Sequence, residues 1–132
     1  MNKNLLLLFV LFVVNFASAQ ATATMVDDAP YNYQDVEVRP EFPGGYTQLM
    51  AFIGKNFKLA DYEGFGGIIK VAFVIEIDGS ITNVKVVKDL GDGTGTEAKR
   101  VVSMFPKWSS GEFGGKKVRV LYELPIKVAS QG

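Results

Sequence analysis

The chain has 132 residues with 14 basic and 14 acidic side chains, so its formal net charge is zero, and it contains neither cysteine nor histidine. The balanced charge argues against nucleic-acid binding, which needs a basic surface. The lack of cysteine and histidine excludes disulfides, the usual zinc sites and catalytic triads.

The first nineteen residues have the organisation of a signal peptide. Lys3 precedes an apolar run from Leu5 to Val14, and Ala-Ser-Ala at 17–19 is an A-x-A cleavage site before Gln20. The run is shorter than the roughly 20 apolar residues that span a bilayer. We therefore predict export to the periplasm with cleavage after Ala19, an uncleaved anchor being the alternative. No membrane span is expected after cleavage.

The mature chain has the size of one domain. Residues 20–37 are polar without an apolar period and are predicted to form a flexible leader. The folded domain is expected over residues 38–128, followed by a short tail at 129–132. The sequence R-P-E-F-P-G-G at 39–45 predicts a turn in front of the first helix.

Two helices and three strands follow from the spacing of apolar residues. Apolar side chains at i, i+3, i+4, i+7 and i+11 from Tyr46 predict a helix over residues 46–56, with a glycine-rich loop over 58–67. Alternation predicts a strand over residues 68–77 and a second over 81–88, joined by a turn at Asp78-Gly79. A two-residue loop would pair Ile75 with Thr82 and Val71 with Val86.

The second helix is expected to begin at Thr94, because Thr94 and Glu97 match a capping box, and to end before Pro106. The last strand is predicted as one long, half-buried strand over residues 117–128, from its strict alternation of apolar and polar residues. The order helix, strand, strand, helix, strand indicates an α+β fold. We expect a three-stranded antiparallel sheet with both helices packed on one face.

Three candidate sites compete with simpler structural interpretations. The segment Asp89 to Glu97 superficially resembles a calcium loop, but its two aspartates are three residues apart, so a turn leading into a helix cap is favoured. The carboxylates of Asp61, Glu63, Glu76 and Asp78 do not form the pattern of a glycosidase pair. Trp108 is either a core aromatic or a partner-facing anchor.

The final strand is the strongest candidate for binding. No later strand follows to cover it, and Lys116, Lys117, Arg119 and Lys127 are charges of the kind that protect an open sheet edge. An open edge also accepts a peptide as an added strand, or pairs with a second copy of the chain.

Five motifs in order resemble the TonB C-terminal domain family in its Bacteroidetes form. They are P-E-F-P-G-G at 40–45, the hairpin at 68–87, E-A-K-R-V-V at 97–102, P-K-W at 106–108 and G-K-K-V-R-V-L-Y-E-L-P-I at 115–126. The resemblance implies a periplasmic, non-enzymatic domain without cofactor or metal. Its partner would be an outer-membrane TonB-dependent receptor, whose box peptide adds a strand beside the last strand. The implied contact residues are Val118, Arg119, Val120, Leu121, Tyr122, Glu123, Leu124 and Ile126.

Two readings of the function remain open from the sequence. The first is receptor binding by strand addition as part of transmembrane transport. The second is a module of the same fold that binds another envelope ligand, such as cell-wall material or a subunit of a complex, without coupling to the proton-driven motor. A chain released by signal cleavage would lack an inner-membrane anchor, and this is the main support for the second reading.

Overall fold

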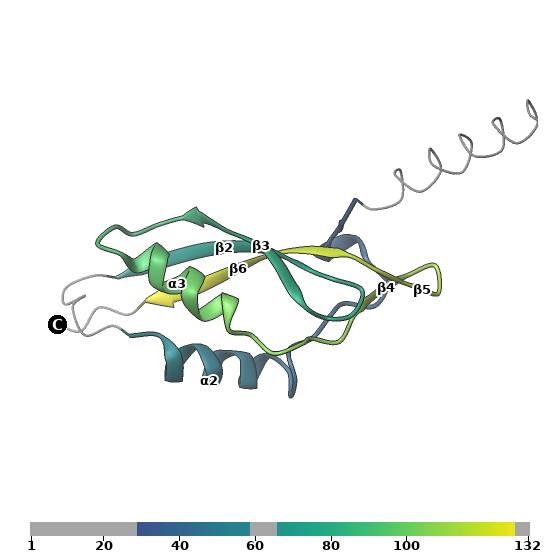
Figure 1. Cartoon of the computed structure of the whole chain (residues 1–132), viewed down its shortest axis with the longest axis horizontal. Helices are drawn as coiled ribbons and strands as arrows, with labels where there is room; N and C mark the ends of the chain where they lie inside the picture. Colours follow the sequence, from purple (N-terminus) through teal and green to yellow (C-terminus); the bar gives the residue numbers. More distant parts are fainter. Residues whose placement is uncertain (1–28, 59–65, 129–132) are drawn as a thin grey trace, which may run out of the picture.

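The computed structural model describes residues 29–58 and 66–128 (Figure 1). The predicted signal peptide, the tail at 129–132 and most of the glycine-rich loop lie outside these residues. The elements are β1 (Tyr31–Asn32), the 3-10 helix η1 (Tyr33–Asp35), α2 (Tyr46–Asn56), β2 (Gly67–Ile75), β3 (Ile81–Lys88), α3 (Thr94–Ser103), β4 (Gly111–Phe113), β5 (Lys116–Val118) and β6 (Val120–Val128).

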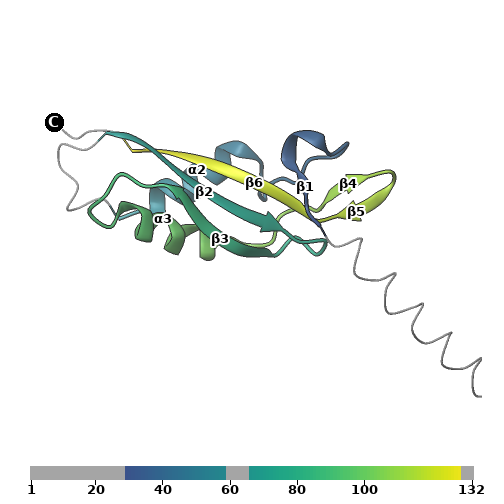
Figure 2. The same ribbon diagram turned by 90° about the horizontal axis from the view of Figure 1, so that it is seen from above.

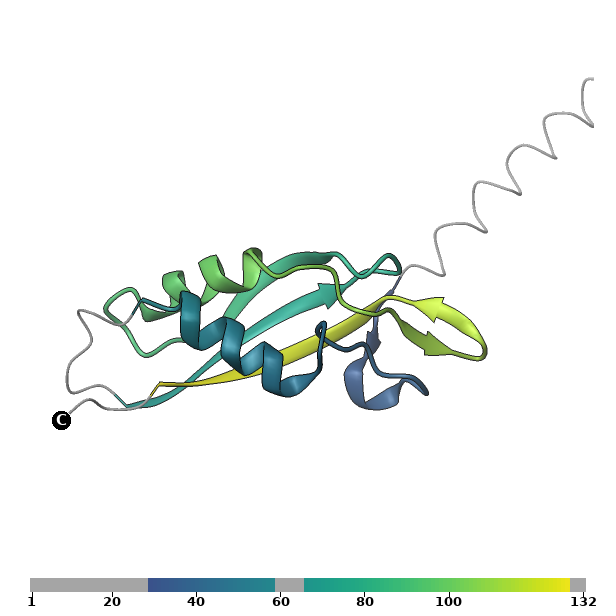
Figure 3. The same ribbon diagram turned by 90° about the horizontal axis from the view of Figure 1, so that it is seen from below.

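The fold is α+β, with both helices on one face of the sheet, as Figures 2 and 3 show from opposite sides. The main sheet has four strands in the order β1-β6-β2-β3, rather than the three predicted, and β4 and β5 form a separate two-stranded sheet. The added strand is β1, which lies within the segment predicted as a flexible leader and pairs with β6 in parallel.

The predicted long last strand is divided at Arg119. Before it, β5 pairs with β4, and after it β6 pairs antiparallel with β2 over nine residues, from Gly67 opposite Val128 to Ile75 opposite Val120. The alternation of apolar and polar residues continues through Arg119, although β5 and β6 pair with different strands. The alternation alone therefore predicted a single strand.

The core lies between the sheet and the helices. The alternate side chains of β2 from position 69 to 75 are fully buried, as its alternation predicted, but the strand ends at Ile75, and Ile77, predicted on the same face, is 55% exposed. Helix α2 contributes Leu49 and Ile53, and α3 contributes Ala98, Val101 and Val102. Each helix therefore buries the middle of its apolar stripe, whereas Tyr46, predicted at the start of the first stripe, is 68% exposed.

The predicted hairpin forms, but its register changes along the strands. Val71 lies opposite Val86 as predicted, whereas Ile75 lies opposite Ile81 and not Thr82. The register of the hairpin shifts at an irregularity between Ala72 and Val74, opposite the part of β3 that contains Asn83, which has a positive φ of 52°. Such a bulge inserts an extra residue on one strand and restores the pairing beyond it.

The start of α3 is capped differently from the prediction. Asp89, and not a capping box, supplies the acceptor: its Oδ1 accepts bonds from the Gly95 N–H at 3.0 Å and from the Thr94 hydroxyl at 2.8 Å. Thr94 is itself fully buried. The resemblance to a calcium loop therefore reflects a carboxylate that holds a helix N-terminus.

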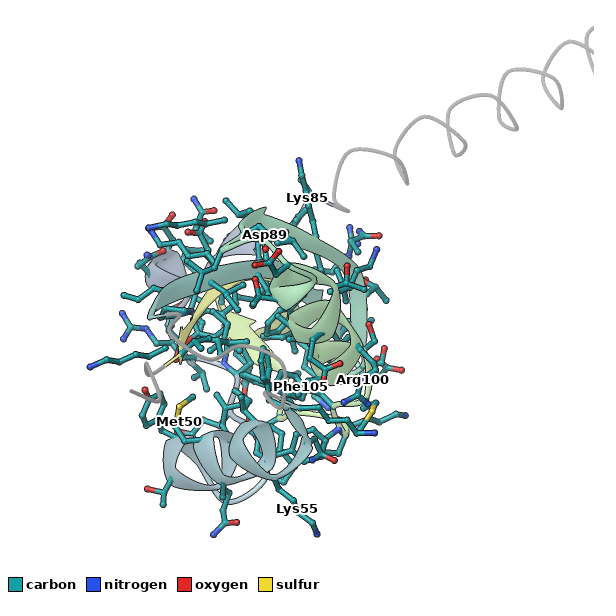
Figure 4. The ribbon with its side chains drawn as sticks, turned by 90° about the vertical axis from the view of Figure 1, so that its left-hand side faces the viewer. Met50, Lys55, Lys85, Asp89, Arg100 and Phe105 are labelled. Carbon is teal, nitrogen blue, oxygen red and sulfur yellow. The ribbon has the colours of Figure 1, made fainter. Side chains whose placement is uncertain are left out.

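Glu97 joins the two helices instead of capping its own. Its carboxylate accepts bonds from Arg100 on α3 and from the backbone N–H of Lys58 just beyond α2, both at 2.7 Å. Arg100 in turn donates to the carbonyl oxygen of Asn56 at 2.7 Å. Figure 4 shows Arg100 on the side of α3 that faces α2, with Phe105 between the two helices.

The hydrogen bond from Arg100 is the main reason that the pKa of Glu97 is lowered from 4.5 to about 2. The ionised form is therefore favoured in the folded state, and its contribution to stability is complete above pH 4.5 and is lost as the pH falls toward 2. We predict that Glu97→Gln lowers the free energy of unfolding by about 1 to 2 kcal/mol at pH 7. Urea denaturation should show this difference shrinking between pH 4.5 and pH 2.

Glu41→Gln is the matched control, because the hydrogen bonds of Glu41 run through its backbone. It should leave the free energy of unfolding nearly unchanged at both pH values. An equal loss of stability in Glu97→Gln at pH 7 and pH 2 would contradict an ionic role for Glu97.

Candidate functional site

The outer edge of β6 is the side of this strand that faces away from β2. Pro125 identifies which residues have their backbone groups on it. Pro125 lies opposite Lys70 in the ladder with β2, and proline has no N–H to donate to that ladder, so its backbone groups must point to the other side. Because backbone groups alternate along a strand, residues 121, 123, 125 and 127 point outward. The bond that the carbonyl oxygen of Arg119 accepts from Tyr31 at 2.9 Å agrees with this assignment.

The side chains of β6 alternate between the core and the solvent. Val120 and Leu124 are fully buried, and Ile126 is buried under the helices, whereas Leu121 and Glu123 are exposed on the opposite face. Six of the predicted contact residues therefore lie on β6. Val118 lies instead on β5, opposite Gly111, and Arg119 lies between the two strands.

The sequence analysis missed that the leader covers part of this edge. Tyr31 and Asn32 of β1 lie opposite Val120 and Leu121. Within the described residues, β6 has no strand partner on its outer edge beyond Leu121. A two-residue strand in a polar segment has no periodicity, so no local sequence signal could have shown this pairing.

Arg119 fixes the beginning of β6 through a pair of hydrogen bonds to Glu76. Its Nε and Nη2 donate to the two carboxylate oxygens of Glu76 at 2.7 and 3.1 Å, and both side chains are mostly shielded from solvent. The Arg119 bond is the main cause of a lowered pKa at Glu76, and Thr82 donates a further hydrogen bond to the same carboxylate. A two-point contact of this kind fixes orientation as well as position.

A group of aromatic residues lies where β6 meets the helix side of the sheet. The ring of Tyr122 contacts that of Tyr33 from η1, with centroids 4.4 Å apart and an interplanar angle of 35°, and it also contacts Phe73 and Trp108. Burial raises the pKa of the Tyr122 hydroxyl. A small cavity of about 120 Å³ opens here, and its lining includes Tyr33, Tyr46, Trp108 and Tyr122.

Trp108 is a core residue. It is 5% exposed, and its ring contacts those of Phe42, Phe73 and Phe105 at centroid distances between 5.7 and 5.8 Å. Its backbone N–H also donates to the carbonyl oxygen of Gly79 at 2.9 Å, which ties the β2–β3 turn to the chain after α3. The interpretation as a surface anchor is therefore not supported.

Two of the four candidate carboxylates, Glu76 and Asp78, lie within the described residues. Hydrogen bonds from Arg119 and Ser80, respectively, lower the pKa values of Glu76 and Asp78, whereas a general acid needs a raised one. Asp61 and Glu63 lie outside the described residues. Among residues 29–58 and 66–128, no cluster of three or more Asp, Glu, His or Cys side chains is placed to hold a metal ion. In the same part of the chain, no helix has the length and apolar character needed to cross a membrane.

Comparison with known proteins gives one family and two similar structures. The family model described as the Gram-negative bacterial TonB protein C-terminal matches residues 58–127. Two NMR solution structures of the Helicobacter pylori TonB C-terminal domain, which begin at different residues, each share 24% sequence identity with this chain. The first has a TM-score of 0.44 and covers 65% of this chain and 94% of its own, and the second has a TM-score of 0.39 and covers 67% and 89%. No curated protein sequence matches the chain.

Trp108 is the only tryptophan, so its fluorescence reports on this core directly. We predict a blue-shifted emission that acrylamide quenches poorly in the folded protein, and a red shift on unfolding. Trp108→Ala should lower the free energy of unfolding by about 3 to 5 kcal/mol, since it leaves a large cavity. Easily quenched emission from the folded protein would place this ring at the surface instead.

Proposed function

Because the chain belongs to the family of Gram-negative bacterial TonB protein C-terminal domains, we propose that it binds outer-membrane TonB-dependent receptors by adding a receptor strand to β6. Domains of this family are periplasmic and act as interaction domains rather than as enzymes. Receptor binding in turn assigns the chain to transport across the outer membrane. The contact surface is the outer edge of β6 with its flanking residues, from Val118 to Ile126.

The observation that carries this proposal is the unpaired stretch of β6 beyond Leu121. Among the described residues, this stretch has a strand on one side only, and its outward backbone groups include the N–H and C=O of Glu123. Unpaired backbone groups on a regular strand are a template for an extended peptide. Successive side chains of β6 lie on opposite faces of the sheet: Leu121 and Glu123 are exposed on one face, and Tyr122 lies on the other. The side chains of an added strand would match both faces in one register, so the register would be fixed.

The second proposal concerns delivery to the periplasm. Residues 1–19 are proposed to direct export and to be removed after Ala19. Intact-mass spectrometry of protein purified from the periplasm should therefore give a chain that begins at Gln20. A mass that includes Met1 would contradict cleavage and would restore an N-terminal anchor.

Strand addition is tested with a synthetic peptide that carries the N-terminal box of a TonB-dependent receptor. In isotope-labelled mature protein, we expect amide shifts along β6 on titration. Glu123→Pro removes one outward N–H but no backbone hydrogen bond to β2, and it should weaken binding by about 2- to 10-fold, the value of one hydrogen bond.

Glu123→Ala is the matched control, because it removes the same side chain and keeps the N–H. Among the described residues, Glu123 forms an ion pair with Lys70 at 3.7 Å, which is exposed on both sides and contributes little. Affinity should therefore change by less than about twofold. Equal affinities in the proline and alanine variants would exclude strand addition at β6, and a folded protein that binds no box peptide would exclude the receptor as partner.

A further inference from the structure

The position of β1 bears on how a partner strand reaches β6. Tyr31 and Asn32 lie on the outer edge of β6, opposite Val120 and Leu121, and the N–H of Tyr31 donates to Arg119 at 2.9 Å. The chain itself thus places a short strand where an added peptide strand would pair. Figure 2 shows β1 beside β6, next to the β4–β5 hairpin.

Pro125 removes one backbone donor from the part of this edge that β1 does not cover. Its outward position has no N–H, so a strand laid along β6 loses a bond there. On β6, the outward residues with both a donor and an acceptor before Pro125 are Leu121 and Glu123, and the outward carbonyl oxygen of Arg119 precedes them. This unbroken run includes the positions that β1 covers. A partner strand that uses the unbroken run must therefore meet β1.

The contacts that hold β1 are few and lie near the surface. Tyr31 is 39% exposed and stacks on Phe113, itself 40% exposed, with centroids 5.0 Å apart. The following η1 adds the tilted ring contact between Tyr33 and Tyr122 and a cation–π contact in which Arg39 lies 5.1 Å from the Tyr33 ring centroid. Two strand residues with exposed side chains belong to the part of a fold that opens locally at low cost.

We propose that the segment from Tyr31 to Asp35 is an intramolecular competitor, which occupies the outer edge of β6 and must leave before a partner strand pairs with the unbroken run. The inference rests on the proposed function for the identity of that partner. In the closed form this segment is paired with β6, and in the open form it has left. Only molecules in the open form can bind the partner along the full edge, so the apparent affinity for the partner falls as the fraction of closed molecules rises. Binding is thereby regulated by the leader.

Tyr31→Pro in the full mature chain tests the competition, because it removes the N–H that bonds to Arg119 and leaves β6 unchanged. Tyr31→Phe is the matched control, since it keeps this N–H and the ring that stacks on Phe113. We expect the receptor box peptide to bind Tyr31→Pro at least about 2- to 10-fold more tightly than it binds Tyr31→Phe, because the closed form of Tyr31→Pro loses both the Tyr31 hydrogen bond and the ring that stacks on Phe113. Equal affinities would overturn the proposal.

A second probe is independent of any receptor. A synthetic peptide with the sequence of residues 29–36 should shift the amides of residues 119–123 in Tyr31→Pro, and should bind Tyr31→Phe more weakly by the same factor. If this peptide discriminates between the variants but no box peptide binds either one, the competition stands and the receptor proposal fails. If the leader peptide binds neither variant, or both equally, the competition is wrong even where the box peptide binds.

Discussion

The packing around Phe73 is the interaction on which the rest of this structure depends. Phe73 is fully buried in β2, and its ring contacts those of Phe105, Trp108 and Tyr122 at centroid distances of 5.7 to 5.9 Å and interplanar angles from 69° to 90°. These contacts join the central strand to the end of α3, to the chain that follows it and to β6. Edge-to-face pairs of this kind add specific geometry to a large buried area. In a domain without disulfides, this cluster fixes where β6 lies relative to the helices.

The placement of β6 gives one strand two different roles. Its inner side chains, such as Val120 and Leu124, complete the core, and the nine-residue ladder with β2 satisfies one row of its backbone groups. The other row faces outward and remains available beyond β1. A peptide that pairs with this row gains backbone bonds without disturbing the core, because the two rows point in opposite directions. The strand addition proposed above would use this outward row and leave the core unchanged.

Two residues decide how much of that outward row is usable. Pro125 limits the row at one end, because it lacks a donor. Arg119 fixes the other end through its paired bonds to Glu76, and its carbonyl oxygen receives the bond from Tyr31. The leader therefore lies on the most complete part of the edge. A short strand with exposed side chains at this position is suited to exchange, whereas a longer apolar strand would cover the edge permanently.

The sequence by itself determined the local elements of this protein. The apolar period placed α2 at residues 46–56, the alternation placed β2, β3 and the inner face of β6, and the order of five motifs indicated the family. These properties depend on neighbours a few residues apart. Tertiary structure decided the parallel pairing of Tyr31 with Val120, the capping of α3 by Asp89 and the burial of Trp108. The pairing of β1 and the packing of Trp108 join parts of the chain that are far apart in sequence. Asp89 caps α3 through a loop conformation that matches no sequence motif. The periodicity of apolar residues depends only on near neighbours and therefore could not predict any of the three.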